Sequence, residues 1–382
     1  MKLTFSGLLL LSLLACAQLN WTSEPNFSGV QQSEKQSFTV DTVLSGLTNP
    51  WSMTWLPNGD MLFTEKGGEL RLYSKGKLHP DPIAGLPEIK VKGQGGLLDI
   101  ELHPNYADNG WLYLSYASPA KKGEPGAGNG QNTALLRAKL VDHALVEAEE
   151  IFKALPNYKK GQHFAGRIEF DREGYLYLSV GDRGGRDEVQ TLTSSRGRVY
   201  RMHDDGSTPK DNPFVGEEGV WEQMYSYGHR NPQGLALHPT TGEIWEHEHG
   251  PQGGDEVNIV RAGKNYGWPA ISFGINYDGS ILTEDTAKVG MEQPVTYWVP
   301  SIAPCGMDFV ESDMYPDWKG NLLVGSLKFR YLKRLELDGN KVTHQEVLLE
   351  GLGRVRCVRQ APDGYIYLAT EGPGLIVRLL PE

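Results

Sequence analysis

"REGYLYLSV", residues 172–180, is one copy of a short phrase that decides how this chain folds. A turn ending in glycine is followed by alternating apolar and aromatic residues, and the apolar segment "AGRIEFD" (165–171) comes directly before it. Apolar alternation on both sides of a tight turn is typical of a β-hairpin. The stretch 165–180 is therefore predicted to form two antiparallel strands.

The same phrase occurs six times along the chain. The other copies are "PNGDMLFTE" (57–65), "DNGWLYLSY" (108–116), "TTGEIWEHE" (240–248), "KGNLLVGSL" (319–327) and "PDGYIYLAT" (362–370). One hairpin cannot bury both of its faces, whereas six hairpins arranged around an axis can. The repeats predict an all-β, six-bladed β-propeller over residues 41–382. A large sandwich is the alternative, and the uneven spacing of the copies disfavours a β-helix.

Composition supports this class and narrows the partners. The 382 residues include 46 Gly and 23 Pro, which favour many turns over long helices. The formal net charge is −11, and an acidic surface repels phosphate backbones, so nucleic acid is not expected as a partner. In a chain with this negative net charge, a local cluster of cations is stronger evidence for a binding site.

The N-terminus "MKLTFSGLLLLSLLACAQLNW" (1–21) is typical of a bacterial export signal. The sequence is compatible with two kinds of processing: ordinary cleavage after Ala17, and lipoprotein processing in which Cys16 is acylated. Either route gives a periplasmic or exported protein, whose contact with a membrane would be a lipid anchor on Cys16. Residues 1–17 are assigned to the signal, and the polar residues 18–40 to a flexible tether.

Two further cysteines, Cys305 and Cys357, follow the tether. A disulfide between them is possible in an oxidising compartment. Two buried thiols are the favoured interpretation, since two cysteines do not make a disulfide framework.

One histidine and one aspartate are predicted to meet across the third hairpin. Residues equally far from the turn of an antiparallel pair face each other. His163 lies eight residues before Asp171, and Asp182 lies eight residues after Gly174. A carboxylate facing an imidazole fixes its tautomer and raises its basicity. The pair is a candidate general base, against the simpler interpretation of two ordinary loop residues.

Other polar residues fall at the same end of their hairpins. In the fourth unit, Arg230 is expected to face Pro251, and Asn231 to face Gly250. Around the axis of a propeller the whole group would gather at one opening: Gln94, His163, Asp182, Arg230, Asn231, Lys328, Arg354 and Arg356. Four cations with amide donors predict an anionic ligand, one with several carboxylates. The alternative is that propeller rims carry charges in any case.

The loop "EHGPQGGDE" (248–256) is a candidate metal site. Its glycines and Pro251 force turns that aim backbone carbonyls, and Asp255 and Glu256 add carboxylates. Ca²⁺ prefers such oxygen ligands, although no EF-hand spacing is present. A plain acidic turn is the alternative.

Several ordered motifs together resemble a known family. They are "GQGGLLDIELHP", "GRIEFDREGYLYLSVGDRG", "YGHRNPQGLA", "EHGPQGGDEVN" with "GKNYGWP", "GSLK" and "RVR", from about residue 40 to the C-terminus. This set resembles the soluble pyrroloquinoline quinone (PQQ) sugar dehydrogenases, in the aldose branch of the glucose/sorbosone dehydrogenase family. The resemblance implies a six-bladed propeller with PQQ, a planar quinone carrying three carboxylates, on its axis.

The resemblance also implies roles for individual residues. PQQ would be held by Gln94, Arg230, Asn231, Ser301, Lys328, Arg354 and Arg356. The carbonyls of Gly250 and Pro251 would bind a Ca²⁺ beside PQQ, and Glu256 with Tyr266 would bind a second, structural Ca²⁺. His163 would be the base and Asp182 its partner, while Arg230 and Ca²⁺ polarise the quinone during hydride transfer from C1 of an aldose. The product would be an aldonolactone, and an external acceptor would take the electrons.

Two positions depart from the glucose dehydrogenase branch. His249 stands where that branch has Gln, and Val299 where it has an aromatic residue. A broader aldose range than glucose is therefore expected. A Ca²⁺-dependent lactonase and a non-catalytic propeller that binds sugar or protein are the alternative functions.

Overall fold

The computed structural model of the chain describes residues 27–382. The predicted export signal, with Cys16, lies outside the described residues. Six antiparallel sheets account for nearly all of the regular structure, five of them with four strands and one with five. The expected six-bladed β-propeller is therefore confirmed.

Each sheet forms one blade, with its strands ordered from the axis outward. Blade 1 is formed by β3 (Pro50–Trp55), β4 (Met61–Glu65), β5 (Glu69–Ser74) and β6 (Lys77–Leu78). Blade 2 is formed by β7 (Leu97–Leu102), β8 (Trp111–Pro119), β9 (Gln131–Val141) and β10 (Ala144–Lys153). Blade 3 is formed by β11 (Ala165–Phe170), β12 (Leu176–Val180), β13 (Arg198–Met202) and β14 (Met224–Tyr227).

Blade 4 is formed by β15 (Pro232–Leu237), β16 (Ile244–Glu248), β17 (Asp255–Ile259) and β18 (Thr296–Trp298). Blade 5 is formed by β19 (Pro304–Phe309), β20 (Leu322–Ser326), β21 (Leu332–Asp338) and β22 (Lys341–Leu348). Blade 6 is formed by β23 (Arg354–Gln360), β24 (Ile366–Glu371), β25 (Leu375–Pro381), β2 (Ser37–Leu44) and β1 (Gln31–Gln32). The described helical segments are α1 (Tyr106–Asn109), η1 (Arg186–Glu188) and η2 (Pro316–Trp318).

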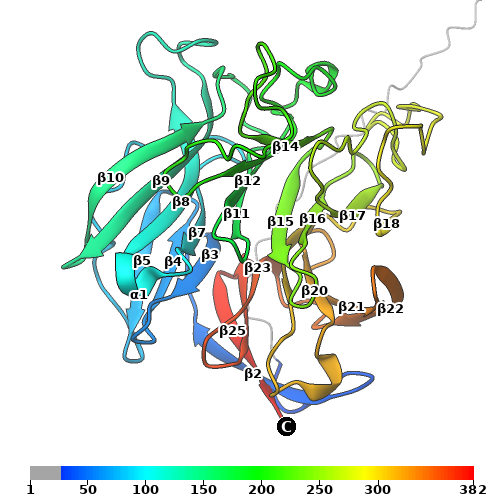
Figure 1. Ribbon diagram of the computed structural model, residues 1–382. Helices are drawn as coiled ribbons and strands as arrows, with labels where there is room; N and C mark the ends of the chain where they lie inside the picture. The colour runs from blue at the N-terminus through cyan, green and yellow to red at the C-terminus, as the bar shows by residue number, and fades with distance from the viewer. Residues whose placement is uncertain (1–26) are drawn as a thin grey trace, which may run out of the picture.

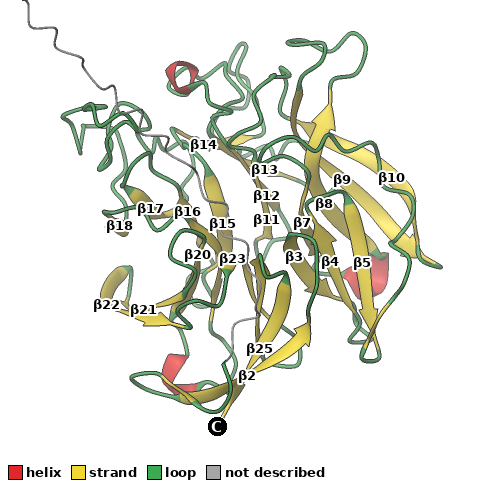
Figure 2. Cartoon of the chain, turned by 180° about the vertical axis from the view of Figure 1, so that it is seen from behind, coloured by secondary structure: helices red, strands yellow, loops and turns green. Residues whose placement is uncertain are grey.

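The first strand of each blade lies innermost. Figures 1 and 2 show β3, β7, β11, β15 and β23 near the middle of the molecule, with β10, β18 and β22 at its edges. One cavity is lined by residues from the beginnings of all six inner strands or from just before them, among them Trp51, Ala165 and Arg354. These beginnings thus meet at one end of the axis, called the mouth below.

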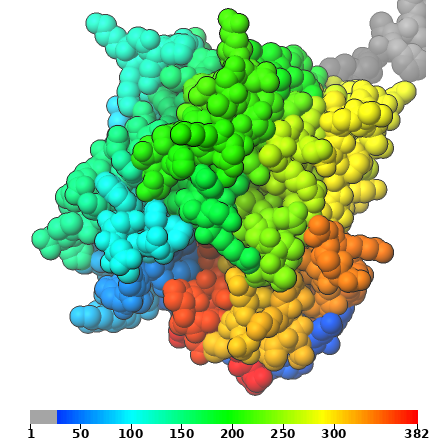
Figure 3. Space-filling view, viewed as in Figure 1, coloured from blue at the N-terminus to red at the C-terminus, as the bar shows by residue number. Residues whose placement is uncertain are grey.

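The ring is closed by a strand from the N-terminal part of the chain. β2 pairs with β25 from Phe38↔Pro381 to Leu44↔Ile376. Figure 3 shows the blue N-terminal residues against the orange and red C-terminal ones. The tether predicted for residues 18–40 is therefore wrong in its last part, because β1 and the start of β2 lie within it. The alternation in "SFTV" (37–40) covers only four residues, which is too few to predict a strand when its partner strand is not known.

The core is divided among the junctions between neighbouring blades. Each of the six adjacent pairs of blades encloses its own cluster of buried apolar side chains. The second strands β4, β12, β16 and β20 are buried along their full length. Their burial follows from having a blade on either side, since a strand covered on both faces has no solvent side, and it includes the polar Glu246 and His247 of β16.

Every inner strand has an irregular register close to the mouth. The shifts lie at Pro50/Ser52, Leu97/Ile100, Ala165/Ile168, Pro232/Gly234, Cys305/Met307 and Val355/Cys357. A bulge adds a residue to one strand and redirects the side chains that follow it. The mouth is therefore built from six strand ends that do not follow the regular pairing of their hairpins.

The two cysteines of the described chain are free and buried, as favoured from the sequence. Within residues 27–382, no helix has the length and apolar character needed to cross a membrane.

Replacing Tyr315 by phenylalanine should destabilise the packing of blade 5 against blade 6. The buried Tyr315 hydroxyl donates to Leu379 O on β25 and accepts from Ile366 N on β24 at 3.1 Å. Phenylalanine keeps the packing but leaves both backbone groups without this partner, at a cost of about 1–3 kcal/mol. Urea denaturation should show this loss, while Tyr277→Phe, at a 74% exposed position, should leave the midpoint unchanged. Equal midpoints for both variants would contradict this role.

Candidate functional site

The mouth contains a cavity of about 310 Å³. Four of the residues predicted from the sequence line it: Gln94, Asn231, Arg354 and Arg356. His163 adjoins them, since its backbone N–H donates to Gln94 Oε1 at 2.6 Å. The structure thus brings together residues from blades 2, 3, 4 and 6 that are far apart in the chain.

Three predicted residues lie at the border of this cavity. Arg230 donates through Nη1 to His249 O at 3.0 Å, and His249 lines the cavity. Lys328 N donates to Ile302 O at 3.2 Å, beside the lining residue Leu327. Ser301 is turned to the start of β17, where its hydroxyl donates to Asp255 Oδ2 at 2.7 Å.

His163 and Asp182 form a hydrogen-bonded pair at the mouth. His163 Nδ1 lies 2.6 Å from Asp182 Oδ1, and Trp268 Nε1 donates to Asp182 Oδ2 at 2.9 Å. Gly181 makes this approach possible, because a Cβ there would lie 2.2 Å from His163 O. The aspartate is held on both oxygens, so the imidazole has a fixed orientation and its Nε2 is left for other partners.

The environment sets the protonation of this pair. Burial lowers the pKa of His163 below its usual 6.5, although the bond to Asp182 acts in the opposite direction. Burial raises the pKa of Asp182, but the hydrogen bond and charge of His163 bring it below the usual value. His163 is thus neutral and Asp182 ionised near neutral pH. The 12% of the His163 side chain that remains exposed leaves room for a substrate.

Arg354 and Arg356 share one carboxylate that sequence reasoning missed. Glu371 binds Arg356 Nη2 at 2.6 Å and Arg354 Nε at 3.1 Å. Burial opposes ionisation of Glu371, but the two guanidinium charges lower its pKa to about 2. Glu371 faces Arg354 directly in the pairing of β23 with β24, so the comparison of positions that paired His163 with Asp182 could have found it.

The positive charge of the mouth is only partly neutralised. Within the described chain, neither Arg230 nor Lys328 forms an ion pair, and Arg230 Nε is buried without a hydrogen-bond partner. Glu371 offsets one of the charges on Arg354 and Arg356. The cavity therefore retains positive charge in a chain of net charge −11, which suits an anionic ligand.

The predicted pairing of the fourth hairpin is off by one residue. The ladder near the turn follows the expected register, as in Leu237↔Ile244. Past the shift at Pro232/Gly234, the two strands pair one residue away from that register. Asn231 O consequently accepts from His249 N at 3.2 Å, whereas Gly250 was expected opposite Asn231. Arg230 likewise contacts His249 O and not Pro251. A bulge of this kind leaves no clear mark in the sequence.

A carboxyl-rich hollow lies beside the mouth. Its volume of about 10 Å³ is that of one ion or water molecule. Three of the predicted metal ligands line it, Gly250, Glu256 and Tyr266, together with Glu248. Pro251 is not part of this lining. The tight turn also crowds carbonyls, since a Cβ on Gly250 would lie 2.2–2.3 Å from the carbonyl oxygens of Gly253 and Gly254.

Three more residues of this region were missed from the sequence. His229, Glu246 and Glu248 are buried and offer ligand atoms within 4.8 Å of one another. Burial, followed by the charge of Glu248, raises the pKa of Glu246, and Glu246 Oε2 has no hydrogen-bond partner. Burial opposes a charge on His229, but Glu246 and Glu248 raise its pKa to about 9. The run "WEHEHG" was the available signal, since it places acids at alternate positions of one strand.

Acidification should destabilise the folded protein through a second buried histidine of this blade. Burial and the charge of Arg167 lower the pKa of the fully buried His247 to about 3, against 6.5 when exposed. Below pH 6.5 the unfolded chain gains a proton that the folded chain does not, so stability falls as the pH drops toward 3. At pH 5 the loss is about 2 kcal/mol.

His247→Leu should remove that loss. The difference in unfolding free energy between pH 7 and pH 5 is expected to be about 2 kcal/mol smaller than in the wild type, as measured with urea. His203→Leu, at a partly exposed position, is the matched control. The same pH dependence in wild type and His247→Leu would rule out this account.

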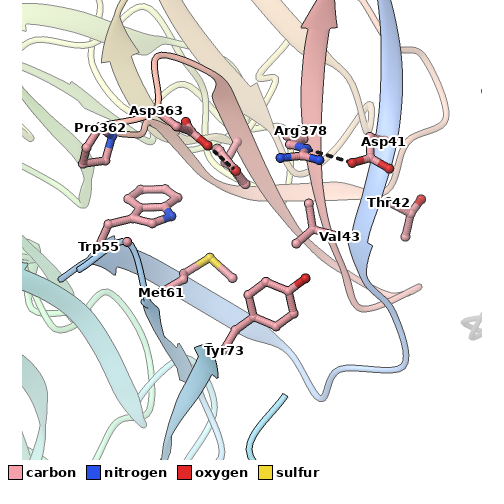
Figure 4. Close-up of a pocket in the computed structure, with 11 residues that line it drawn as sticks. Asp41, Thr42, Val43, Trp55, Met61, Tyr73, Pro362, Asp363 and Arg378 are labelled. Carbon is pink, nitrogen blue, oxygen red and sulfur yellow. Dashed lines mark hydrogen bonds and ion pairs between the residues drawn. The ribbon is translucent and has the colours of Figure 1, made fainter. Parts of the chain in front are cut away.

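A second hollow lies away from the predicted site. Figure 4 shows Trp55, Met61 and Tyr73 opposite the hydrogen-bonded pair Arg378 and Asp41. The cavity that they line has a volume of about 350 Å³. It is at the seam between blades 1 and 6, and none of the predicted site residues lines it. The mouth cavity is the one in which the chemically active groups converge.

Comparison with known proteins agrees with this geometry. The family model described as Glucose / Sorbosone dehydrogenase matches residues 47–378. An aldose sugar dehydrogenase of Escherichia coli is 40% identical over 350 residues, which is 90% of this chain and 93% of that protein.

Solved structures of similar proteins share the whole fold. The apo-form of the soluble aldose sugar dehydrogenase from Escherichia coli has a TM-score of 0.85 at 38% identity, covering 90% of this chain and all of that one. The PQQ-bound aldose sugar dehydrogenase from Streptomyces coelicolor has a TM-score of 0.73 at 27% identity, covering 90% and 98%. This chain belongs to the glucose/sorbosone dehydrogenase family.

Proposed function

We propose that this protein oxidises aldoses at C1 to aldonolactones, with PQQ as oxidant and Ca²⁺ as a second cofactor. The observation that carries the proposal is the cavity in which the hydrogen-bonded His163–Asp182 pair adjoins a group of cations. Oxidation of a sugar by a carboxylate-bearing oxidant requires a base that removes a proton and a cationic surface that holds the oxidant. Both are found in this one cavity.

The residues present fit the cofactors. Arg230, Lys328, Arg354 and Arg356 would hold the three carboxylates of PQQ, with Gln94 and Asn231 as amide donors. Arg230, whose buried Nε has no hydrogen-bond partner, also lines the small hollow beside the mouth. The converging carbonyls of the 250–254 turn would hold Ca²⁺, and Glu256 with Tyr266 a second ion beside Glu248.

The geometry supports a role for each of these protein side chains. The sugar would lie with its C1 hydroxyl at His163 Nε2, because Nδ1 is bonded to Asp182. Neutral His163 takes the hydroxyl proton, and the ionised Asp182 stabilises the imidazolium that results. When bound, PQQ supplies the two-electron oxidant for the hydride that leaves C1. Loss of this proton and hydride converts the C1 alcohol into the lactone carbonyl, and an external acceptor removes the electrons.

Reconstitution tests the proposal directly. Apo-protein mixed with PQQ and Ca²⁺ should reduce a redox dye when glucose is added, and should not do so without PQQ. Hydrolysis of a lactone without dye reduction would favour the lactonase alternative. Binding of sugar without either activity would favour a non-catalytic propeller.

The N-terminal sequence supports export of the protein to the periplasm. The mass of the mature N-terminus distinguishes cleavage after Ala17 from a lipid anchor on Cys16. A full-length cytoplasmic chain would contradict export.

A further inference from the structure

Four lysines lie on the mouth side of blades 1, 2 and 3 in this acidic chain: Lys66, Lys92, Lys159 and Lys160, called the lysine patch below. Three of them donate to backbone carbonyls. Lys66 Nζ contacts Gly93 O at 3.2 Å, Lys92 Nζ contacts Lys159 O at 2.9 Å, and Lys160 Nζ contacts Gly184 O at 2.5 Å. A carbonyl satisfies a hydrogen bond but leaves the charge of the ammonium uncompensated.

The lysine patch is built into the segments that carry the catalytic base. Gln94 N donates to Gly161 O at 2.7 Å, and Gln94 Oε1 accepts from His163 N at 2.6 Å. The two segments touch so closely that a Cβ on Gly93 would lie 2.3 Å from Gly161 O. The cations are therefore fixed next to Gln94 and His163, on loops with little freedom to move apart.

The carboxylates of the same side do not neutralise the lysine patch. No lysine of the patch forms an ion pair within residues 27–382, whereas several acids of the same side have cations of their own. These pairs are Glu69 with Arg71, Glu124 with Lys153, Glu150 with Lys121 and Glu188 with Arg196. The buried Arg183, which donates to Lys160 O at 3.1 Å, adds one more positive charge. The patch is thus a local excess of positive charge in a chain of net charge −11.

We propose that the preferred substrates of this protein are anionic aldoses, which carry a carboxylate or a phosphate remote from C1. This inference rests on the proposed function, in which C1 lies at His163. An aldose held there would have the rim formed by residues 92–94 and 159–163 beside it, because Gln94 and His163 are hydrogen-bonded to each other, and the long lysine side chains of this rim could reach an anion on its distal carbons. Uncompensated ammonium groups at such a rim attract the anion without contributing to the binding of a neutral sugar.

An acidic electron-acceptor protein is the competing partner for these charges. A protein that covered the mouth would also meet the outer loop of blade 4, which carries Asp278, Glu284, Asp285 and Glu292. Of these acids, Asp285 pairs with Lys288 and Glu292 with Lys264. An acidic partner would approach the remaining negative charges, whereas a small anion contacts the lysine patch alone. The charge distribution therefore favours the substrate.

Steady-state kinetics of the PQQ- and Ca²⁺-loaded enzyme test this proposal with three sugars: glucose, glucuronate and glucose 6-phosphate. The wild type should show a higher kcat/KM for one or both anions than for glucose. Comparing the two anions distinguishes a site for carboxylates from one for phosphates. Raising the ionic strength from about 0.01 to about 0.15 M shortens the Debye length from about 30 to about 8 Å and should lower kcat/KM for the anions only.

Substitutions assign the effect to the lysine patch. The double variant Lys92→Gln with Lys160→Gln should lose about tenfold in kcat/KM for the anions and change little with glucose. Lys92→Arg with Lys160→Arg keeps the charge and should keep the preference. Lys77→Gln, at the opposite end of the axis, is the matched control and should change nothing.

Three outcomes would overturn the proposal. Equal kcat/KM for glucose and both anions in the wild type would show that the patch does not select the substrate, while leaving the sugar dehydrogenase function intact. If the glutamine variants changed the dependence of the rate on acceptor concentration, the patch would be assigned to the acceptor. If they changed the PQQ titration, it would be assigned to the cofactor. Absence of dye reduction with all three sugars would remove the proposed function as well.

Discussion

The variant His163→Gln should lose turnover by about 10²–10⁴-fold while still binding PQQ. Glutamine fills much of the space of the imidazole but cannot accept a proton from the C1 hydroxyl. The contact of His163 N with Gln94 Oε1 is made by the backbone, so the variant retains it. PQQ titration by absorbance should give the wild-type curve, and sugar-dependent dye reduction should almost disappear.

The same experiment has an internal check. His344→Gln replaces a histidine on the outer strand β22, 45% exposed, and should leave turnover unchanged. Asp182→Asn should lower turnover and also alter its pH profile, because the carboxylate raises the basicity of His163. Unchanged sugar-dependent dye reduction by His163→Gln would exclude His163 as the base.

Arg356→Met should weaken PQQ binding by thirtyfold or more. The guanidinium lines the cavity and also donates to Gln233 Oε1 and Cys305 Sγ, both at 3.3 Å. Its removal takes away one positive charge and leaves the part-buried Glu371 with Arg354 as its only ion-pair partner among residues 27–382. Truncating one member of a buried charge pair costs about 2–5 kcal/mol in binding.

A double-mutant cycle separates the two causes. Adding Glu371→Gln to Arg356→Met removes the uncompensated carboxylate and should restore part of the affinity for PQQ. Arg378→Met, which disrupts a half-exposed pair with Asp41 at the seam of blades 1 and 6, should titrate like the wild type. Coinciding curves for Arg356→Met and wild type would show that Arg356 does not hold the cofactor.

Comparison of sequence and structure shows how local patterns and register shifts combine. The contact of His163 with Asp182 was predicted from their equal distances from the turn, but the ladder next to the turn is one residue away from that register, as in Phe170↔Leu176. The ladder of this hairpin shifts at Ala165/Ile168, and the Ala165↔Val180 pairing beyond the shift leads to the observed contact. In the fourth blade the same method placed Asn231 opposite Gly250, and the shift at Pro232/Gly234 made that placement wrong by one residue.

Other features depend on segments that are remote in the sequence. β2 became recognisable as a strand only by its pairing with β25, and the predicted tether therefore extended too far. Glu371 is an exception, because it faces Arg354 within one hairpin and its position could have been predicted from that register. The lysine patch could not be assigned a place because its members become neighbours only where the loops of three blades meet.

The sequence by itself determined the number of blades, the hairpin within each blade and the clustering of cations at one end of them. These features follow from the two-residue period of a strand and from the turn residues, which act over short distances. Only the tertiary structure decided which groups share the cavity, which of the cations are neutralised and where the acids beside it lie. Register shifts at the mouth and contacts between blades fix those distances, and both arise from packing between segments far apart in the chain.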